Sequence, residues 1–404
     1  MPPTTTSEEA IMYRSAALLY AAVITGFIAM YLPQPILPQL AQAFDVSPSA
    51  ASLSIGMLVM SIAVASLFVG PLSDRIGRKP VLVSCALFLA VPSLGCAFAQ
   101  DLPSLLFWRA MQGLCIPGLI AVSVAYIAEE FPQQAGTLLG GYIAATVSGG
   151  LLSRILSGSI ADAFGWRWAF VLSALLSVAV GLLLLRMLPA SRRFVSSQRL
   201  IQAFSGMARH LRNRQLVGGF IVGFTLFFAF LGLFTYLPFY LAAPPFSFSA
   251  TAVGLMYLTY SSGIVSSPLA GWLTQRYSRQ NIMAVGILIT MLAQLATLQG
   301  GTISLIAALL LLCFGNFIVQ GTTTAYVASK AERDRASASS LYLFFYYIGG
   351  SIGAVLPGMV WERMAWPGVL MLTLSALFLA LLSVLLFCHE DEDTQPSAQQ
   401  RASL

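Results

Sequence analysis

Two arginines lie inside apolar stretches of the sequence that are long enough to cross a lipid bilayer. Arg109 falls in the stretch Leu102–Ile127, and Arg154 falls in the next one, Thr137–Ile160. A positive charge in such a position is costly and usually serves a function. At 1.5 Å per residue, both side chains lie about 10 Å from the same face of the membrane. They could therefore hold an anionic or strongly hydrogen-bonding part of a small solute.

The alternative interpretation of the two arginines is structural. Long cationic side chains can reach outer headgroups, and they can pair with backbone carbonyls or with acids at helix ends. Asp101 and Asp162 are the nearest acids along the sequence, and neither lies deep within an apolar stretch. Both interpretations stay open at this level.

Four amide side chains also fall at mid-depth in apolar stretches: Gln34, Gln112, Asn316 and Gln320. Hydrocarbon penalises a polar group that has no partner, so these residues are candidates for the lining of a solute cavity. Asn316 and Gln320 are four residues apart and share one helix face. A few amides among many aromatic side chains suit an amphipathic organic solute.

We find no residues spaced for catalysis or metal binding. The two histidines lie outside the apolar stretches, and the five cysteines have no ligand spacing. No Gly-rich phosphate loop ending in Lys-Ser or Lys-Thr occurs. We therefore expect a protein that is not an enzyme, with no catalytic residue, no metal and no cofactor.

The composition indicates what kind of protein positions these side chains. The 404 residues are 58% hydrophobic and only 9% charged, with a mean hydropathy of +0.82. Soluble proteins carry about 25% charged residues, so soluble enzymes and nucleic-acid binders are excluded despite the net charge of +6. The sequence predicts an all-α polytopic membrane protein.

Twelve apolar segments have the length that a membrane-spanning helix needs. They are Tyr13–Leu40, Ala50–Leu72, Val81–Ala99, Leu102–Ile127, Thr137–Ile160, Trp166–Met187, Gln215–Leu241, Ala250–Leu273, Ile282–Leu298, Ser304–Val327, Ser337–Val360 and Gly368–Phe387.

The distribution of positive charge predicts the orientation of these segments. Seventeen of the 21 Lys and Arg residues fall on one side if the N-terminus is cytoplasmic. The positive-inside rule then places both termini in the cytoplasm. The predicted organisation is a tail (1–12), a six-helix bundle (13–187), a basic cytoplasmic linker (188–214), a second bundle (215–387) and a disordered acidic tail (388–404).

The sequence also contains an internal repeat. Gly70–Lys79 and Gly271–Gln280 share Gly, Leu and two Arg at an offset of 201 residues, and Gly149 matches Gly349 at an offset of 200. The repeat predicts two related halves with the same orientation. Such halves usually enclose a midplane site and alternate the access to it.

Several motifs resemble those of the major facilitator superfamily. The loop Gly70–Lys79 is similar to the signature loop of that superfamily, and Arg109-Ala-Met-Gln112-Gly113 is similar to its second motif. Gln34-Pro35 and the segment 338–349 carry a narrower resemblance to the YnfM-type branch of bacterial inner-membrane efflux permeases. The resemblance implies twelve transmembrane helices in two pseudo-symmetric six-helix halves.

The resemblance also implies a cytoplasmic gate in the signature loop. Its residues here are Gly70, Asp74, Arg75, Gly77, Arg78 and Lys79. Gly77 permits a tight chain reversal. We expect Asp74 to meet the N-terminus of the eleventh segment, near Ser337, and the cations to pair with Glu129 or Glu130.

The fifth segment departs from the antiporter motif of the superfamily. It carries Gly149, Gly150 and Gly158, which allow close helix packing, but it lacks the Pro that the motif expects. No carboxylate or His lies at mid-membrane to carry a coupled proton. The candidates for proton coupling are Asp74, Glu129 and Asp162.

The leading hypothesis from the resemblance is a secondary transporter that exports a small organic solute by alternating access, in antiport with H⁺. Uptake or facilitated diffusion of an organic anion is the alternative. A non-transporting membrane sensor on the same scaffold is the alternative from another class. The expected partners are the solute, a coupled proton and the lipid bilayer, with no nucleic acid. We expect a monomer in the bacterial inner membrane.

Overall fold

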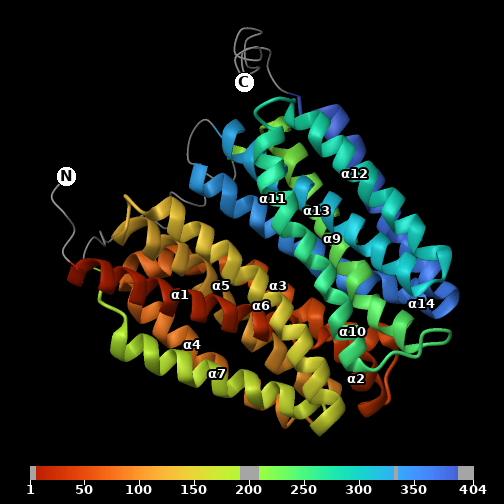
Figure 1. Ribbon diagram of the computed structural model, residues 1–404, viewed down its shortest axis with the longest axis horizontal. Helices are drawn as coiled ribbons and strands as arrows, with labels where there is room; N and C mark the ends of the chain where they lie inside the picture. The colour runs from red at the N-terminus through yellow and green to blue at the C-terminus, as the bar shows by residue number, and fades with distance from the viewer. Residues whose placement is uncertain (1–5, 192–208, 332–334, 390–404) are drawn as a thin grey trace. The chain divides into compact units, whose positions relative to one another are not determined.

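The structure is a computed structural model that describes residues 6–191, 209–331 and 335–389. Apart from short connections these residues are helical, and they contain no strand (Figure 1). The predicted all-α polytopic fold is therefore confirmed. Most of the predicted linker (192–208) and acidic tail (390–404), with part of the N-terminal tail (1–5), lies outside the described residues.

The described helices group into two compact units. The first unit contains the described residues up to 191 together with Ser247–Leu255, and the second contains the rest. Helices of the first unit are α1 (Thr6–Tyr31), η1 (Gln34–Ile36), α2 (Leu37–Ala43), α3 (Pro48–Ile76), α4 (Arg78–Ala97), α5 (Leu102–Glu130), α6 (Ala135–Phe164) and α7 (Trp166–Met187). The later helices are α9 (Arg214–Ala242), α10 (Ala250–Met256), η2 (Tyr257–Ser261), α11 (Ser262–Leu273), α12 (Arg279–Ala296), η3 (Thr297–Gln299), α13 (Thr302–Lys330) and α14 (Arg335–Phe387).

The predicted spans correspond to these helices with two local differences, in spans one and eight. Among the described residues, ten helices are each long and apolar enough to cross a membrane. The predicted spans eleven and twelve both fall within α14, where a kink at Ala365 separates two helices. Span eight is divided into α10, η2 and α11, and span one is interrupted after Tyr31. Most of α10 also groups with the first unit, whereas the repeat assigns it to the second half.

Two glycines reverse the chain between consecutive helices of the first unit. Gly77 connects α3 to α4 with φ of 99°, and Gly165 connects α6 to α7 with φ of 92°. A residue with a Cβ rarely adopts such angles. The turn expected at Gly77 is thus present, and it places the signature loop at the junction of α3 and α4.

The internal repeat is visible in equivalent hydrogen bonds within each unit. In the first unit, the hydroxyl of Tyr126 donates to the carbonyl of Pro189 at 3.1 Å. In the second unit, 200 residues later, the hydroxyl of Tyr326 donates to the carbonyl of His389 at 3.4 Å. Each bond joins the fourth span of a unit to the chain just after the sixth.

Equivalent glycines bring equivalent helices together. A Cβ on Gly149 of α6 would lie 2.9 Å from the Cα of Ile24 on α1. A Cβ on Gly349 of α14 would collide with the carbonyl of Phe224 on α9. Ile24 and Phe224 are also 200 residues apart. Both units therefore need a glycine where the first and fifth spans approach.

We predict that Gly149→Ala and Gly349→Ala each lower the thermal stability of the purified protein. The added methyl group must push two backbones apart, at a cost of about 1–3 kcal/mol. Unfolding in detergent, followed by tryptophan fluorescence, measures the change.

Gly136→Ala is the matched control for these substitutions. Gly136 is also helical in α6, but a Cβ there would meet no atom within 4 Å. Ala is a better helix former than Gly, so this variant should keep or raise the melting temperature. Equal melting temperatures for all three variants would contradict the packing argument.

Candidate functional site

Helix α1 stops at Tyr31 because the following residues cannot continue its hydrogen-bond ladder. Pro33 and Pro35 have no backbone N–H, so the carbonyl of Ala29 loses the donor that residue 33 would supply. The chain continues through η1 into α2. The end of α1 therefore needs hydrogen-bond donors from another part of the first unit.

Arg109 of α5 supplies those donors. One terminal nitrogen of its guanidinium donates to the carbonyl of Ala29 at 2.7 Å, and the other donates to the carbonyl of Met30 at 2.9 Å. Its Nε donates to the carbonyl of Ser54 on α3 at 2.9 Å. The side chain is fully buried. Of the two sequence interpretations, these contacts fit the structural one, in which Arg109 joins α1, α3 and α5.

Gln112 extends this network toward α4. Its Oε1 accepts from Arg109 at 2.6 Å, and its Nε2 donates to the hydroxyl of Ser93 at 2.8 Å. A Cβ on Gly113 would collide with the carbonyl of Leu58 on α3, so this glycine allows α5 to approach α3. The three residues of the second motif thus act together in packing.

Arg154 of α6 has a different set of contacts. Its Nε donates to Oε1 of Gln34 at 2.7 Å, and one terminal nitrogen donates to the carbonyl of Gly150 at 2.6 Å. The guanidinium lies 4.1 Å from the centre of the Tyr31 ring, a distance typical of a cation–π contact. Arg154 is only 1% exposed. The structure thus brings Gln34 and Arg154 together at the broken end of α1.

Gln34 carries a donor that the described residues leave unused. The side chain is fully buried, and its Nε2 has no hydrogen-bond partner among the described residues. A guanidinium can only donate, so the amide atom that faces Arg154 must be the oxygen. The amide nitrogen is therefore held in a fixed direction with two N–H groups to offer.

The signature loop contains an ion-paired cluster. Arg78 forms a two-point contact with Glu129 of α5, from Nε at 3.1 Å and from a terminal nitrogen at 2.6 Å. The guanidinium also lies 2.5 Å from a carboxylate oxygen of Asp74 and bonds the hydroxyl of Ser73. The cluster fastens the α3–α4 junction to the end of α5.

The remaining loop residues are less buried. Arg75 is exposed, Lys79 is half-buried, and a side chain at Gly70 would meet no atom within 4 Å. Ser337, near which we expect Asp74 to find a helix N-terminus, belongs to the second unit. That contact stays a prediction.

Asp162 caps the start of α10. Its carboxylate accepts from the backbone N–H of Thr251 at 2.8 Å, from the Thr251 hydroxyl at 2.6 Å and from the N–H of Ala250 at 3.3 Å. Gln39 of α2 donates to the same carboxylate at 3.4 Å. The first N–H groups of a helix lack intrahelical partners, so the carboxylate fills a structural need. Asp162 therefore holds Ser247–Leu255 against α6 within the first unit.

Small residues support this contact between α6 and α10. A Cβ on Gly158 would collide with the carbonyl of Ala250, and a Cβ on Gly254 would lie 2.5 Å from the carbonyl of Arg154. Arg154, Gly158 and Asp162 are spaced four residues apart and share one face of α6. The same helix face thus carries the buried cation and the capping acid.

The candidates of the second unit lie on α13. Asn316 is buried and Gln320 is half-buried. Nearby helices contribute a buried aromatic cluster, in which the rings of Phe227 and Tyr346 stack with centroids 4.1 Å apart. The side chains of Gln34, Arg109 and Arg154 have no polar counterparts in the second unit, because residues 234, 309 and 354 are Phe, Leu and Ala.

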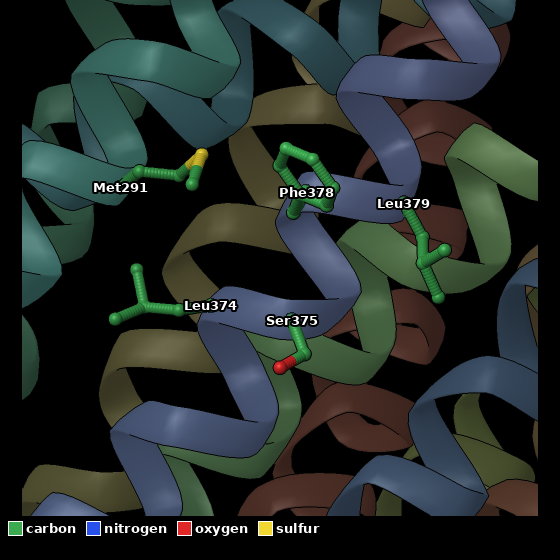
Figure 2. Close-up of a pocket in the computed structure, with 5 residues that line it drawn as sticks. All are labelled: Met291, Leu374, Ser375, Phe378 and Leu379. Atoms are coloured by element: carbon green, nitrogen blue, oxygen red, sulfur yellow. The ribbon is translucent and has the colours of Figure 1, made fainter.

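An apolar groove of about 470 Å³ lies between α12 and α14. Figure 2 shows its lining side chains: Met291, Leu374, Ser375, Phe378 and Leu379. Phe378 and Leu379 are more than half exposed, and none of the predicted site residues contributes.

The sequence analysis missed two residues of the first-unit site. Tyr31 lies under the Arg154 guanidinium, and Ser93 receives the Gln112 amide. Tyr31 could have been noticed, because Pro33 and Pro35 predict a break in the helix next to it. Nothing in the sequence singles out Ser93.

We predict that Arg109→Met destabilises the protein by about 2–4 kcal/mol. Met keeps much of the volume, but the carbonyls of Ala29 and Met30 lose their donors inside the first unit. Thermal unfolding in detergent measures the loss. Leu309→Met is the control, because Leu309 is the buried counterpart in the repeat and the exchange conserves volume. A smaller loss for Arg109→Met than for the control would contradict this role.

We predict that Asp162→Ala increases hydrogen exchange at the amides of Ala250 and Thr251. Losing a capping acid costs about 1–2 kcal/mol of local stability. Asp162→Asn keeps one acceptor oxygen and should show a smaller increase. Exchange followed by mass spectrometry on peptides from 247–255 gives the measurement, and unchanged protection in the Ala variant would refute the capping assignment.

Comparison with known proteins places the chain among membrane transporters. The model of the Major Facilitator Superfamily matches residues 19–354 and 243–403. The inner membrane transport protein YnfM of Escherichia coli K12 is 35% identical over 358 residues, with 88% of this chain and 86% of YnfM covered. An uncharacterized transporter of Buchnera aphidicola from Schizaphis graminum is 32% identical over 366 residues, with 90% and 89% covered.

A solved structure has the same fold at low sequence identity. A bacterial homologue of the human lysosomal transporter Spinster, in an inward-facing and unoccupied conformation, aligns with a TM-score of 0.78 at 16% identity. The alignment covers 94% of this chain and 96% of that one. With a family model spanning most of its length and relatives above 30% identity, this multi-pass membrane protein belongs to the major facilitator superfamily of transporters.

Proposed function

We propose that the protein exports a small organic solute by alternating access, in antiport with protons. The observation that carries the proposal is the asymmetry between the two related units. Gln34 and Arg154 form a buried polar pair in the first unit, whereas the repeat has Phe234 and Ala354 at those positions. The shared scaffold does not require the pair, so a role in solute handling accounts for it.

The proposed setting is the bacterial inner membrane, with both termini in the cytoplasm. The excess of Lys and Arg on one side of the predicted spans supports this orientation. The signature-loop cluster would then face the cytoplasm. A monomer is sufficient, because the two fused units together provide a complete transporter.

Proton coupling would use a carboxylate near the membrane surface. Among the described helices, the candidate acids lie near helix ends, with Glu129 and Asp74 around Arg78 and Asp162 at α10. Protonation of Glu129 would remove the charge-assisted bonds that Arg78 donates and loosen the α3–α4 junction. Glu129 is therefore our first candidate for coupling.

Transport in proteoliposomes tests the proposal. Vesicles with an imposed pH gradient would be assayed with three labelled probes: ethidium as a cation, benzoate as an anion and methyl benzoate as a neutral ester. We predict that at least one probe accumulates against its gradient only when the pH gradient is present. Glu129→Gln should abolish this accumulation but keep exchange of labelled for unlabelled probe, since it removes the titratable group and keeps its shape.

Facilitated diffusion of an organic anion is the second candidate. The buried cation at Arg154, together with the surface position of the candidate acids, favours it. Benzoate flux that only dissipates its own gradient, with no effect of pH, would support this candidate over antiport. Folded protein that moves no probe in any condition would count against transport and favour a sensor.

A further inference from the structure

The Gln34 side chain in the first unit is buried and has a hydrogen-bond donor that a ligand could use. Its oxygen is occupied by Arg154 at 2.7 Å, and its nitrogen has no partner among the described residues. A buried donor without an acceptor costs about 1–3 kcal/mol. A ligand that relieves this cost must bring an acceptor oxygen or nitrogen.

The neighbouring groups add a positive charge and a rigid frame. The Arg154 guanidinium is held by Gln34, by the carbonyl of Gly150 and by the Tyr31 ring. Pro33 and Pro35 restrict the backbone on both sides of Gln34. Donors that are fixed before binding lose little entropy when a ligand arrives. The arrangement is therefore a preorganised donor group beside a cation.

We propose that the Gln34 amide nitrogen and the Arg154 guanidinium bind the carboxylate of an organic acid, which is the transported solute. This inference rests on the proposed transport function and specifies the substrate class of its site. A carboxylate brings two acceptor oxygens and a negative charge, which suit an N–H donor adjacent to a cation. A neutral ester could accept from Gln34 but gains no charge attraction, and a cation is repelled by Arg154.

The site is closed in this structure, since Gln34 and Arg154 are at most 1% exposed. The carboxylate must therefore enter after a conformational change that exposes the end of α1, where Gln34 and Arg154 lie. Alternating access provides such a change, because it exposes a midplane site to each side in turn.

Binding measurements on the full-length protein in detergent test this inference. The probes are benzoate, phenylacetate and decanoate, each compared with its methyl ester, and the readouts are thermal shift and isothermal titration. We expect wild-type protein to bind at least one carboxylate about tenfold or more tightly than its ester, the ratio that one charge-assisted hydrogen bond supplies. The ester serves as an internal control for apolar contacts.

Three substitutions separate the proposed contacts. Gln34→Leu removes the donor, Arg154→Ala installs the residue of the second unit, and Gln34→Glu places a negative charge beside Arg154. Each should weaken carboxylate binding about tenfold or more. Arg154→Ala should also leave ester binding within about twofold, because only the anion gains from the charge of Arg154. Gln34→Glu should also keep the wild-type melting temperature, since the new carboxylate can pair with Arg154.

Arg167→Ala is the matched control for loss of an arginine. Arg167 also lies over an aromatic ring, 4.3 Å from Trp166, but it is exposed. This variant should bind carboxylates like the wild type. If it weakened binding as much as Arg154→Ala, the effect would be one of net charge and the inference would be wrong.

Three further binding results would overturn the inference, and they can be told apart from the transport results that would overturn the proposed function. Equal binding of acids and esters, no binding of any carboxylate, or wild-type carboxylate affinity in folded Gln34→Leu protein would each refute it. Transport of ethidium or methyl benzoate in the vesicle assay would leave export intact while the substrate class failed. Absence of all transport by protein that binds carboxylates would refute the proposed function, and with it the statement that the bound acid is transported, while the carboxylate site would stand.

Discussion

The broken end of helix α1 is the constraint on which the first unit depends. Two prolines interrupt the helix after Tyr31, and Arg109 donates to the carbonyls of Ala29 and Met30 at the end of the helix. A charged donor inside apolar surroundings is costly alone, but here two of its bonds satisfy carbonyls at the end of a broken helix. The break also turns Gln34 toward Arg154. Structural support and the candidate site thus arise from the same interruption.

The two units keep a common frame and differ in the polar residues placed within it. A bridge between the third and sixth spans recurs, as Ser93 with Ser173 at 3.4 Å and as Thr373 donating to Gln294 at 3.0 Å. By contrast, Arg109 and Arg154 have apolar counterparts in the second unit. Contacts that recur are best explained by packing. Of the contacts confined to the first unit, those of Arg109 support the end of α1. The Gln34–Arg154 pair leaves a donor unused, and solute handling should be sought there.

Much of this could be predicted from the sequence, for identifiable reasons. Long apolar segments reveal spans because each must cover the same membrane thickness, and the repeat reveals the two halves because its glycines recur at a fixed offset. From the sequence we inferred that Arg109 and Arg154 lie at similar depth in the membrane, and we interpreted them together. The sequence alone could not separate the roles of the two arginines, because those roles depend on which carbonyls the break in α1 leaves at the helix end. The division of span eight was missed, since local backbone geometry leaves little trace in hydropathy. The kink at Ala365, by contrast, falls between the predicted spans eleven and twelve.

Helix α6 links two of the described contacts mechanically. Arg154 and Asp162 lie on one face of it, two turns apart, with Gly158 between them against Ala250. A rigid helix that rotates about its axis moves every side chain on that face in the same sense. A rotation that turned Arg154 away from Gln34 would also withdraw Asp162 from the N–H of Thr251. A movement of Arg154 would thus be passed to α10 without any change within α6 itself.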